Sequence, residues 1–433
     1  MARYYVETYG CTSNRGETQQ IERALREGGH RPASSPQEAD VAILNTCTVV
    51  EKTERNMLRR AKELDEQTPA DLIVTGCMAL AQGEQFDDLD AEILHWDDVP
   101  EYVLNGECPT ITPDTQPVLT DATGILPIAR GCMSDCSYCI TKQATGRIDS
   151  PSVEENVRKA RALVHGGARE IRIAGQDTGV YGWYINQGES LLPELLDRIC
   201  TEIDGDFRVR LGMANPGGIY DIAEELASVF AEHDEIYNFL HAPVQSGSDD
   251  VLEDMRRQHQ VQQFREIVET FDRHLDYWTL ATDFIVGFPT EEPDDHEASL
   301  DLIRDICPEK LNVTRFSKRP GTDAAEMDGL GGTLKKERSK AMSELKMDVV
   351  GEAYEAMVGT ERTVLLTEDG TEDSLVGYDE AHRQVALPKA QLQGLEIGDF
   401  VDVEITGHNT VYALGEPALP NDHGTQAVVE FTN

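Results

Sequence analysis

Residues 129–140, Ala-Arg-Gly-Cys-Met-Ser-Asp-Cys-Ser-Tyr-Cys-Ile, bring Cys132, Cys136 and Cys139 within eight residues of one another. Three thiolates on one short loop can hold three irons of a [4Fe-4S] cluster and leave the fourth iron open to a small molecule. A closed zinc site needs a fourth Cys or His at short range, and the sequence near this loop has none. Three buried structural thiols are the alternative, but they do not explain a loop that follows Gly131 and contains Asp135. We therefore interpret the stretch as a cluster-binding loop.

Length and cysteine usage bound the class of protein. At 433 residues the chain is too long for one typical domain, and we predict two or three. It has no apolar run near the length of a membrane span and no signal-peptide pattern, so we expect a cytoplasmic protein. Nine cysteines in a reducing compartment favour metal or cluster ligation over disulfides. Cys108, Cys200 and Cys307 stand alone, and we expect each to be a small buried hydrophobic side chain.

The charge of the chain is strongly negative. It has 80 acidic and 38 basic residues, a net charge of −42, and only 11 of the basic residues are lysine. The acidic residues are spread along the chain rather than gathered in a tail, which indicates a surface adapted to high salt and a halophilic source. At molar salt the Debye length shrinks to about 3 Å, so such a surface does not exclude an RNA substrate. The few basic side chains fall in small groups such as Arg256 and Arg257; these could contact phosphate, but on helices such residues more often face solvent or pair with nearby Glu.

Three more cysteines stand at strand ends in the first third of the chain. Apolar strands are expected near 3–8, 41–45 and 72–76, with helices near 16–27 and 51–66, which predicts βα units and a parallel sheet. Cys11, Cys47 and Cys77 each follow one of these strands closely. Because the carboxyl ends of parallel strands meet at one edge, the three thiols should converge there. They predict a second three-thiolate iron-sulfur site, with a redox pair among them as the alternative.

A second region of alternating strands and helices follows a linker. Residues 107–123 are rich in Pro and Thr, which is typical of a linker. Beyond it the sequence predicts an alternation of helices and apolar strands, which again indicates a parallel sheet. The helices are expected near 152–165, 190–203, 219–231, 248–257, 261–274 and 294–305, and the strands near 169–174, 207–213, 237–242, 279–286 and 310–316.

The cysteine motifs occur in the order of a known family. They are Tyr-Gly-Cys-Thr-Ser-Asn at 9–14, Asn-Thr-Cys-Thr-Val at 45–49, Thr-Gly-Cys-Met at 75–78 and Ala-Arg-Gly-Cys-x3-Cys-x2-Cys at 129–139. The chain thereby resembles the methylthiotransferases, which are radical S-adenosylmethionine (SAM) enzymes, over essentially its whole length. The resemblance implies a partial (β/α)6 barrel, SAM bound at the open iron of one [4Fe-4S] cluster, and an auxiliary [4Fe-4S] cluster in the N-terminal domain.

The resemblance also selects candidate contacts for SAM or the substrate at the barrel strand ends. Arg210 is suited to bidentate pairing with a carboxylate such as that of SAM, and an interior salt bridge is the alternative. Gln245 and Ser246 belong to a Pro-x-Gln-Ser-Gly-Ser pattern that the chain shares with the family. The full set of predicted contacts is Tyr138, Gln176, Asp177, Arg210, Gln245, Ser246, Asp283 and Phe316.

The C-terminal part predicts a long helix over 334–356 and then a small β-rich unit. This unit resembles the TRAM domain, a small barrel that the family uses to hold tRNA. It carries 12 acidic and three basic residues over 358–420, so charge gives no support for RNA binding, and a structural β-barrel is the alternative. The predicted domains are thus 1–110 (auxiliary cluster), 122–333 (radical SAM barrel), 334–356 (linking helix) and 357–420 (TRAM-like barrel), an α/β fold overall.

The implied reaction inserts sulfur into an unactivated C–H bond and methylates the sulfur, and the sequence leaves the order of these steps open. The loop at 10–17 most resembles the archaeal and eukaryotic branch, which acts on N6-threonylcarbamoyladenosine at tRNA position 37. Isopentenyladenosine in tRNA and an aspartate of a ribosomal protein are the alternative substrates. The expected partners are tRNA, SAM, and a sulfur donor and an electron donor that the sequence does not identify. A non-catalytic RNA-binding or cluster-carrier protein is the alternative from a different class.

Overall fold

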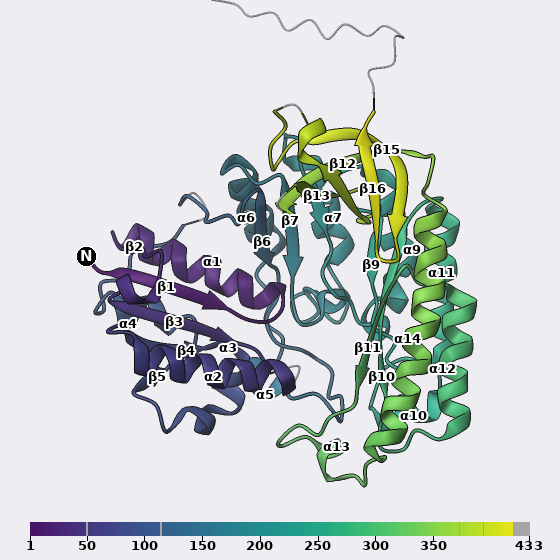
Figure 1. Ribbon diagram of the computed structural model, residues 1–433, viewed down its shortest axis with the longest axis horizontal. Coiled ribbons are helices and arrows are strands. Elements are labelled where there is room, and N and C mark those ends of the chain that lie inside the picture. The colour runs from purple at the N-terminus through teal and green to yellow at the C-terminus, as the bar shows by residue number, and fades with distance from the viewer. Residues whose placement is uncertain (49–50, 113–114, 372, 393, 419–433) are drawn as a thin grey trace, which may run out of the picture.

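The computed structural model describes residues 1–48, 51–112, 115–371, 373–392 and 394–418. They form an α/β protein of three units that follow one another along the chain (Figure 1). The predicted domain boundaries remain predictions. Residues 419–420 of the predicted barrel, Val49 of a cysteine motif and residues 113–114 of the predicted linker lie outside the described part. Within that part, no helix is both long and apolar enough to span a membrane.

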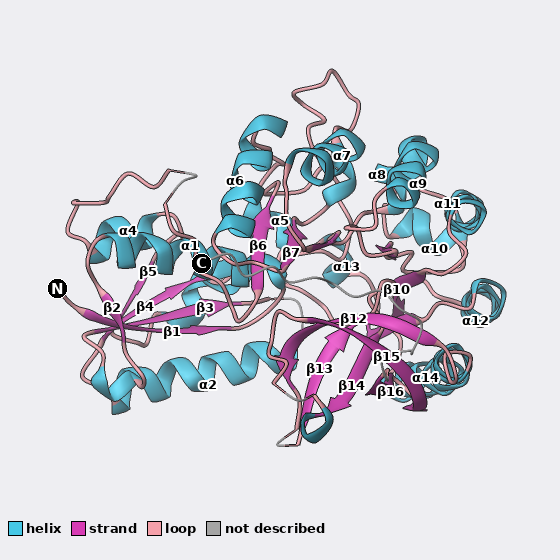
Figure 2. Cartoon of the chain, turned by 90° about the horizontal axis from the view of Figure 1, so that it is seen from above, coloured by secondary structure: helices cyan, strands magenta, loops and turns pink. Residues whose placement is uncertain are grey.

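The N-terminal unit is a five-stranded parallel sheet in the order β2-β1-β3-β4-β5. Figure 2 shows α2 on one face of the sheet and α1 and α4 on the other. The middle residues of β3 and β4 are apolar and buried, because both faces of the sheet are covered. The strands are β1 (Arg3–Thr8), β2 (Arg31–Pro32), β3 (Val41–Thr46), β4 (Asp71–Thr75) and β5 (Ala91–Ile93), and the helices are α1 (Thr12–Glu27), α2 (Glu51–Gln67), α3 (Gly76–Ala81) and α4 (Asp98–Val103).

The central unit is a partial barrel of six parallel strands. Two three-stranded sheets, β6-β7-β8 and β9-β10-β11, are linked by a parallel bridge between Val209 and Ile236. The strands are β6 (Thr123–Pro127), β7 (Glu170–Ala174), β8 (Arg208–Arg210), β9 (Phe239–His241), β10 (Thr279–Val286) and β11 (Lys310–Arg315). The helices are α5 (Thr141–Thr145), α6 (Val153–His165), α7 (Leu192–Glu202), α8 (Pro216–Ile219), α9 (Ala223–Glu232), α10 (Asp249–Asp254), α11 (Val261–His274), α12 (Pro293–Ile306) and α13 (Asp323–Glu326).

The C-terminal unit is a closed β-barrel, as predicted, and its five strands are arranged in the order β12-β13-β14-β16-β15. The long helix α14 (Gly332–Glu355) leads into it. In Figure 1 the barrel lies at the top of the molecule, in yellow and light green. Its strands are β12 (Glu361–Asp369), β13 (Ser374–Tyr378), β14 (Gln384–Pro388), β15 (Phe400–Asn409) and β16 (Tyr412–Pro417).

This small barrel docks on the strands of the central unit where β10 and β11 begin. The hydroxyl of Tyr277 donates to Asp379 at 2.6 Å, and Arg383 donates to the carbonyl of Trp278 at 2.8 Å. Lys310, the first residue of β11, donates to the carbonyl of His382 at 2.6 Å. The RNA-binding candidate is therefore fixed to the catalytic unit by buried polar contacts.

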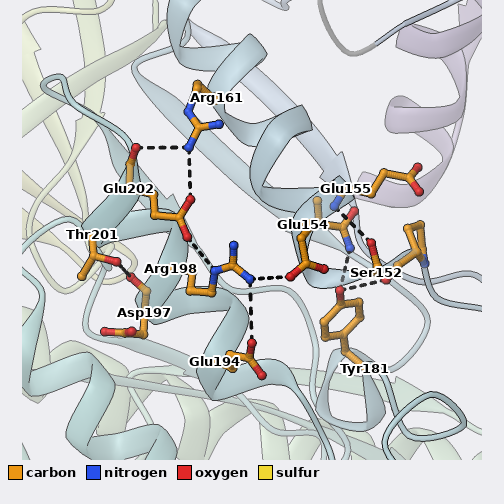
Figure 3. A network of polar contacts seen from close by, with 12 residues as sticks. Ser152, Glu154, Glu155, Arg161, Tyr181, Glu194, Asp197, Arg198, Thr201 and Glu202 are labelled. Atoms are coloured by element: carbon orange, nitrogen blue, oxygen red, sulfur yellow. Dashed lines mark hydrogen bonds and ion pairs between the residues drawn. The ribbon is translucent and has the colours of Figure 1, made fainter.

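Ion pairs on the surface consist mainly of arginine and carboxylates. Figure 3 shows Arg198 of α7 between Glu154 at the start of α6 and Glu194 and Glu202 of its own helix. Arg161 of α6 reaches the same Glu202 at 3.2 Å. The network joins two outer helices of the barrel in a chain that has few cations and many anions.

Candidate active site

The three N-terminal cysteines meet at the carboxyl edge of the parallel sheet. Cys11 precedes α1, Cys47 follows β3, and Cys77 lies in the first turn of α3. All three line one cavity of about 680 Å³. The structure thus brings together three thiols that are 36 and 30 positions apart in the sequence.

Two glycines allow this close approach. Gly10 has φ +109°, and a Cβ atom there would lie 2.7 Å from the Cβ of Cys47. Gly76 has φ +87°, and a Cβ atom there would lie 2.4 Å from the carbonyl oxygen of Thr46. Asn14 ties the loops together, because its side chain donates to Asn45 Oδ1 and to the Thr46 carbonyl, both at 3.0 Å. Glycine in the Gly-Cys pairs is therefore a steric requirement of the site.

The second cysteine group lies on the loop after β6 and faces the same cavity. Cys132, Cys136 and Cys139 all line it. Gly131 has φ +82°, and a Cβ atom there would lie 2.2 Å from the Arg147 carbonyl oxygen. The backbone N–H of Gly131 donates to Gln176 Oε1 at 2.7 Å, which ties the loop to the end of β7. The two groups of three cysteines therefore open into a single space.

Burial favours the protonated form of three of these thiols, Cys77, Cys132 and Cys136. It raises the pKa of Cys132 to about 11, with the nearby charge of Asp177 as the next cause. It also raises the pKa of Cys77 and of Cys136, and for Cys136 the adjacent Arg257 guanidinium opposes this effect. A bound metal supplies the positive charge that turns such thiols into thiolate ligands. The donor sets, three thiols each with no fourth cysteine, fit two iron-sulfur clusters that each keep one open iron.

Of the eight predicted contacts for SAM or substrate, Gln176 and Arg210 line the cavity. The guanidinium of Arg210 lies 4.9 Å from the centre of the Phe239 ring. No hydrogen bond or ion pair joins it to any residue that the structure describes, which argues against the interior salt bridge considered as its alternative.

Two further predicted contacts, Asp177 and Asp283, are not among the residues that line the cavity. Asp177 is buried and accepts hydrogen bonds from the backbone N–H groups of Gly179 and Asn215, so it shapes the loop after β7. Asp283 is bonded at 3.1 Å to Nε2 of His241, which does line the cavity. Burial raises the pKa of Asp283, but His241, the hydrogen bond from Asn312 and the charge of Arg257 together lower it more, so this pKa lies below its usual value.

The other four predicted contacts belong to the packing around the site. Tyr138 and Phe316 both meet the ring of Phe288 edge-on, at 6.5 and 5.4 Å between centroids. Gln245 has φ +78° and exchanges backbone hydrogen bonds with Asp283 and Ile285 of β10. Ser246 is buried, and its hydroxyl accepts from the backbone N–H of Ser248. Roles for these four in binding SAM remain predictions.

Two residues at the site were not predicted. Arg257, which we had grouped with Arg256 as a surface pair, reaches into the cluster loop and donates to the sulfur of Cys136 at 3.6 Å. It also donates to the Pro243 carbonyl at 2.7 Å and to Asn215. His241 stands two residues before the Pro-x-Gln-Ser-Gly-Ser pattern, and that position is the signal that could have identified it.

Two of the three remaining cysteines differ from expectation. Cys108 and Cys307 are exposed, and Cys200 is half-buried, so the prediction of small buried side chains is wrong for the first two. Cys108 lies in an irregular segment after α4, and Cys307 ends α12 in a left-handed turn at φ +42°.

Models of known families match the three units in order. The Radical SAM superfamily matches residues 126–303, and the TRAM domain matches residues 355–418. The family described as "Uncharacterized protein family UPF0004" matches residues 3–96. The cluster loop thus lies in the radical SAM match, and Cys11, Cys47 and Cys77 lie in the N-terminal one.

Solved structures with a similar fold are radical SAM enzymes of low sequence identity. One is the methyltransferase TsrM from Kitasatospora setae, with a TM-score of 0.53 and 11% identity over 75% of this chain and 77% of that one. Another is the cobalamin-dependent enzyme OxsB, with a TM-score of 0.50 and 13% identity over 80% of this chain and 56% of that one. At such identities the likeness shows the fold alone.

Curated relatives match almost the whole chain. A "Probable threonylcarbamoyladenosine tRNA methylthiotransferase" of Pyrococcus abyssi is 35% identical over 96% of this chain and 99% of its own length. Its counterpart in Archaeoglobus fulgidus is also 35% identical, with the same shares covered. The threonylcarbamoyladenosine tRNA methylthiotransferase of Drosophila melanogaster is 34% identical over 96% of this chain and 77% of its own length. Identity of this extent, across all three units, shows that the chain belongs to the threonylcarbamoyladenosine tRNA methylthiotransferase family of radical SAM enzymes.

Proposed function

We propose that the chain converts N6-threonylcarbamoyladenosine at position 37 of tRNA to its 2-methylthio derivative. The observation that carries the proposal is the single cavity of about 680 Å³ into which two groups of three cysteines open from different units. One group alone would serve many radical reactions, whereas two groups facing one space suit a reaction that brings a radical and a sulfur to the same carbon. In the product, a C–S–CH3 group replaces the C2–H bond of the adenine.

The proposed cofactors are two [4Fe-4S] clusters, one on Cys132, Cys136 and Cys139 and one on Cys11, Cys47 and Cys77. When bound, the first cluster and SAM supply the 5′-deoxyadenosyl radical that removes the hydrogen atom, and a second SAM supplies the methyl group. The sulfur donor and the electron donor are further partners that the chain needs.

The residues of the chain position these groups and shield them from water. Gln176 holds the cluster loop through Gly131, and Arg257 holds it through Cys136. The buried carboxylate of Asp177 holds the loop after β7 through the backbone N–H groups of Gly179 and Asn215, close enough to Cys132 for its charge to act on that thiol. Cys47 is buried, and Cys77, Cys132, Cys136 and Cys139 are partly buried, which limits the access of water that would otherwise compete for a reactive intermediate.

The C-terminal barrel is proposed to hold the tRNA. Its low content of basic residues leaves shape, stacking and polar contacts to provide the binding. A tRNA substrate also places the proposed reaction in the cytoplasm. We further propose that the acidic surface serves a high-salt environment, and unfolding of the chain on transfer to low salt would support this proposal.

Two cysteine variants of the reconstituted chain test the proposal. Cys132→Ala should abolish cleavage of SAM to 5′-deoxyadenosine, because it removes a ligand of the radical-generating cluster. Cys47→Ala should retain SAM cleavage and lose methylthiolation of tRNA, because it removes only the auxiliary site. A Cys47→Ala protein that still methylthiolates tRNA would rule out the role of the second cluster. A substrate carrying isopentenyladenosine, converted in preference to threonylcarbamoyladenosine, would favour the alternative substrate.

A further inference from the structure

Among the described residues, three side chains that line the cavity carry a guanidinium or ammonium group: Lys142, Arg210 and Arg256. Two of them are already paired with acidic side chains. Lys142 lies 3.2 Å from Asp135, and Arg256 lies 2.5 Å from Asp323. Of these three cationic side chains, Arg210 alone forms no ion pair with any residue in the part of the chain described.

The one acidic side chain whose charge is shown to act on Arg210 among the described residues, Glu170, is engaged elsewhere. Glu170 at the start of β7 accepts from Arg172 at 2.8 Å and from Thr123 at 2.9 Å. Burial, and then the charge of Arg172, lower the pKa of Arg210 to about 10. The guanidinium therefore stays charged at neutral pH, in a place where no carboxylate of the described residues forms an ion pair with it. A buried charge of this kind is costly unless a ligand pairs with it.

Arg210 lies between the cluster cavity and the C-terminal barrel. It lines both the cavity of about 680 Å³ and a second cavity of about 240 Å³. The second cavity extends to Tyr378 and Gln384 of the C-terminal barrel. Gln176, in contrast, is bonded to the cluster loop itself. Arg210 is therefore on the side from which a substrate held by the C-terminal barrel would enter.

We propose that Arg210 binds the threonyl carboxylate of the substrate nucleoside and selects the threonylcarbamoyl group over neutral alternatives. This inference rests on the proposed function. Threonylcarbamoyladenosine carries one carboxylate on its side chain, whereas isopentenyladenosine and unmodified adenosine carry none. A guanidinium offers a planar fork that matches a carboxylate in two hydrogen bonds. The ring of Phe239 under the guanidinium holds it in place.

The competing ligand is the carboxylate of SAM, and both can be measured on the reconstituted full chain. The probes are anticodon stem-loop RNAs that carry either threonylcarbamoyladenosine or adenosine at position 37, and SAM alone. Arg210→Gln should weaken binding of the first RNA about ten- to a hundredfold, as expected for loss of a charge-assisted hydrogen bond. Binding of the adenosine RNA and of SAM should not change. Arg210→Lys, which keeps the charge but loses the fork, should lie between the wild type and Arg210→Gln.

A third RNA, whose threonyl carboxylate is a methyl ester, isolates the effect of charge. The wild type should bind this ester RNA as weakly as the adenosine RNA, and Arg210→Gln should not distinguish the three. Arg208→Gln is the matched control, because Arg208 lies on the same strand but stacks on Phe400 outside the cavity lining. Thermal unfolding of each variant verifies that it is folded.

The outcomes separate this inference from the proposed function. If the wild type prefers the threonylcarbamoyl RNA and Arg210→Gln keeps that preference, the proposal for Arg210 is overturned and the function stands. If Arg210→Gln instead weakens SAM binding and lowers SAM cleavage without RNA, the carboxylate that it binds is that of SAM. If the wild type neither prefers nor converts the threonylcarbamoyl RNA, the proposed function and this inference fail together.

Discussion

The guanidinium of Arg257 lies 3.6 Å from the sulfur of Cys136, although 121 positions separate the two residues in the chain. Arg257 follows α10 and is also anchored to the carbonyl of Pro243. Its charge lowers the pKa of Cys136, against the larger effect of burial, which raises it. A cation at this distance stabilises both the free thiolate and the negative charge of a thiolate-bound cluster.

Arg257→Met should therefore weaken retention of the cluster on the loop at 132–139. The expected result is lower iron content after anaerobic reconstitution and a more negative reduction potential for the remaining cluster, read by electron paramagnetic resonance. Arg273→Met is the control, since Arg273 pairs with Glu224 on an exposed helix face. Equal iron content and equal potential in Arg257→Met and the wild type would show that the Arg257 charge does not act on the cluster.

Gly10→Ala should disrupt the auxiliary site. The new Cβ atom would lie 2.7 Å from the Cβ of Cys47, at a backbone φ of +109°. We expect loss of the iron bound by the N-terminal cysteines, with SAM cleavage retained. Gly29→Ala is the matched control, because Gly29 also has a positive φ of +82° but nothing within 4 Å of the added atom. If Gly29→Ala loses as much iron as Gly10→Ala, backbone strain would explain the loss in both variants. If Gly10→Ala keeps the wild-type iron content, the contact with Cys47 does not disturb the site.

A buried ion pair joins the long helix α14 to the loop after β10. Arg338 donates to Glu291 at 2.6 Å, and both side chains are 6% exposed. Arg338→Met leaves the carboxylate buried without its partner, which should destabilise the fold by about 3–5 kcal/mol. The free energy of unfolding in urea measures the effect. The double variant Arg338→Met with Glu291→Gln should recover part of the lost free energy of unfolding. If it recovers none, the loss comes from altered packing and not from the unpaired charge of Glu291.

Lys310 should make stability depend on pH between neutral and alkaline conditions. Burial, and next the charge of Arg210, lower the pKa of Lys310 to about 7, against about 10.4 for an unfolded lysine. Between these values the unfolded chain binds more protons, so the free energy of unfolding should rise with pH. Lys310→Met should flatten this rise, as followed by thermal unfolding from pH 7 to pH 10. An equal slope in the variant and the wild type would contradict the shifted pKa.

Particular residues show how far the sequence alone predicts this fold. The apolar runs of β3, β4 and β10 predicted their strands because a parallel sheet buries both faces. The strand expected over 207–213 ends at Arg210, and Gly212 just beyond it lies close against the carbonyl of Ile173 in β7. Helix α1 begins at Thr12, four residues before the expected start, with Cys11 as its N-cap. Strand β6, at the end of the expected linker, was not predicted.

The candidate site shows a similar division between local and tertiary signals. The six cysteines carry a local pattern, and parallel-strand geometry was enough to predict that Cys11, Cys47 and Cys77 converge. Arg257 and His241 reach the site through tertiary packing, which no local pattern of charge reveals. That Arg210 has no ion-pair partner in the part of the chain described is also a tertiary property, since it depends on how Glu170 is engaged by Arg172 and Thr123.

Nucleoside mass spectrometry of tRNA is the most direct test of the central claim. The comparison uses a strain that lacks the gene, and the same strain complemented with the wild type, with Cys132→Ala or with Cys47→Ala. The account predicts that 2-methylthio-threonylcarbamoyladenosine disappears in the deletion strain while its unmethylthiolated precursor accumulates, and that only the wild type restores it. Unchanged 2-methylthio-threonylcarbamoyladenosine in the deletion strain would contradict the account.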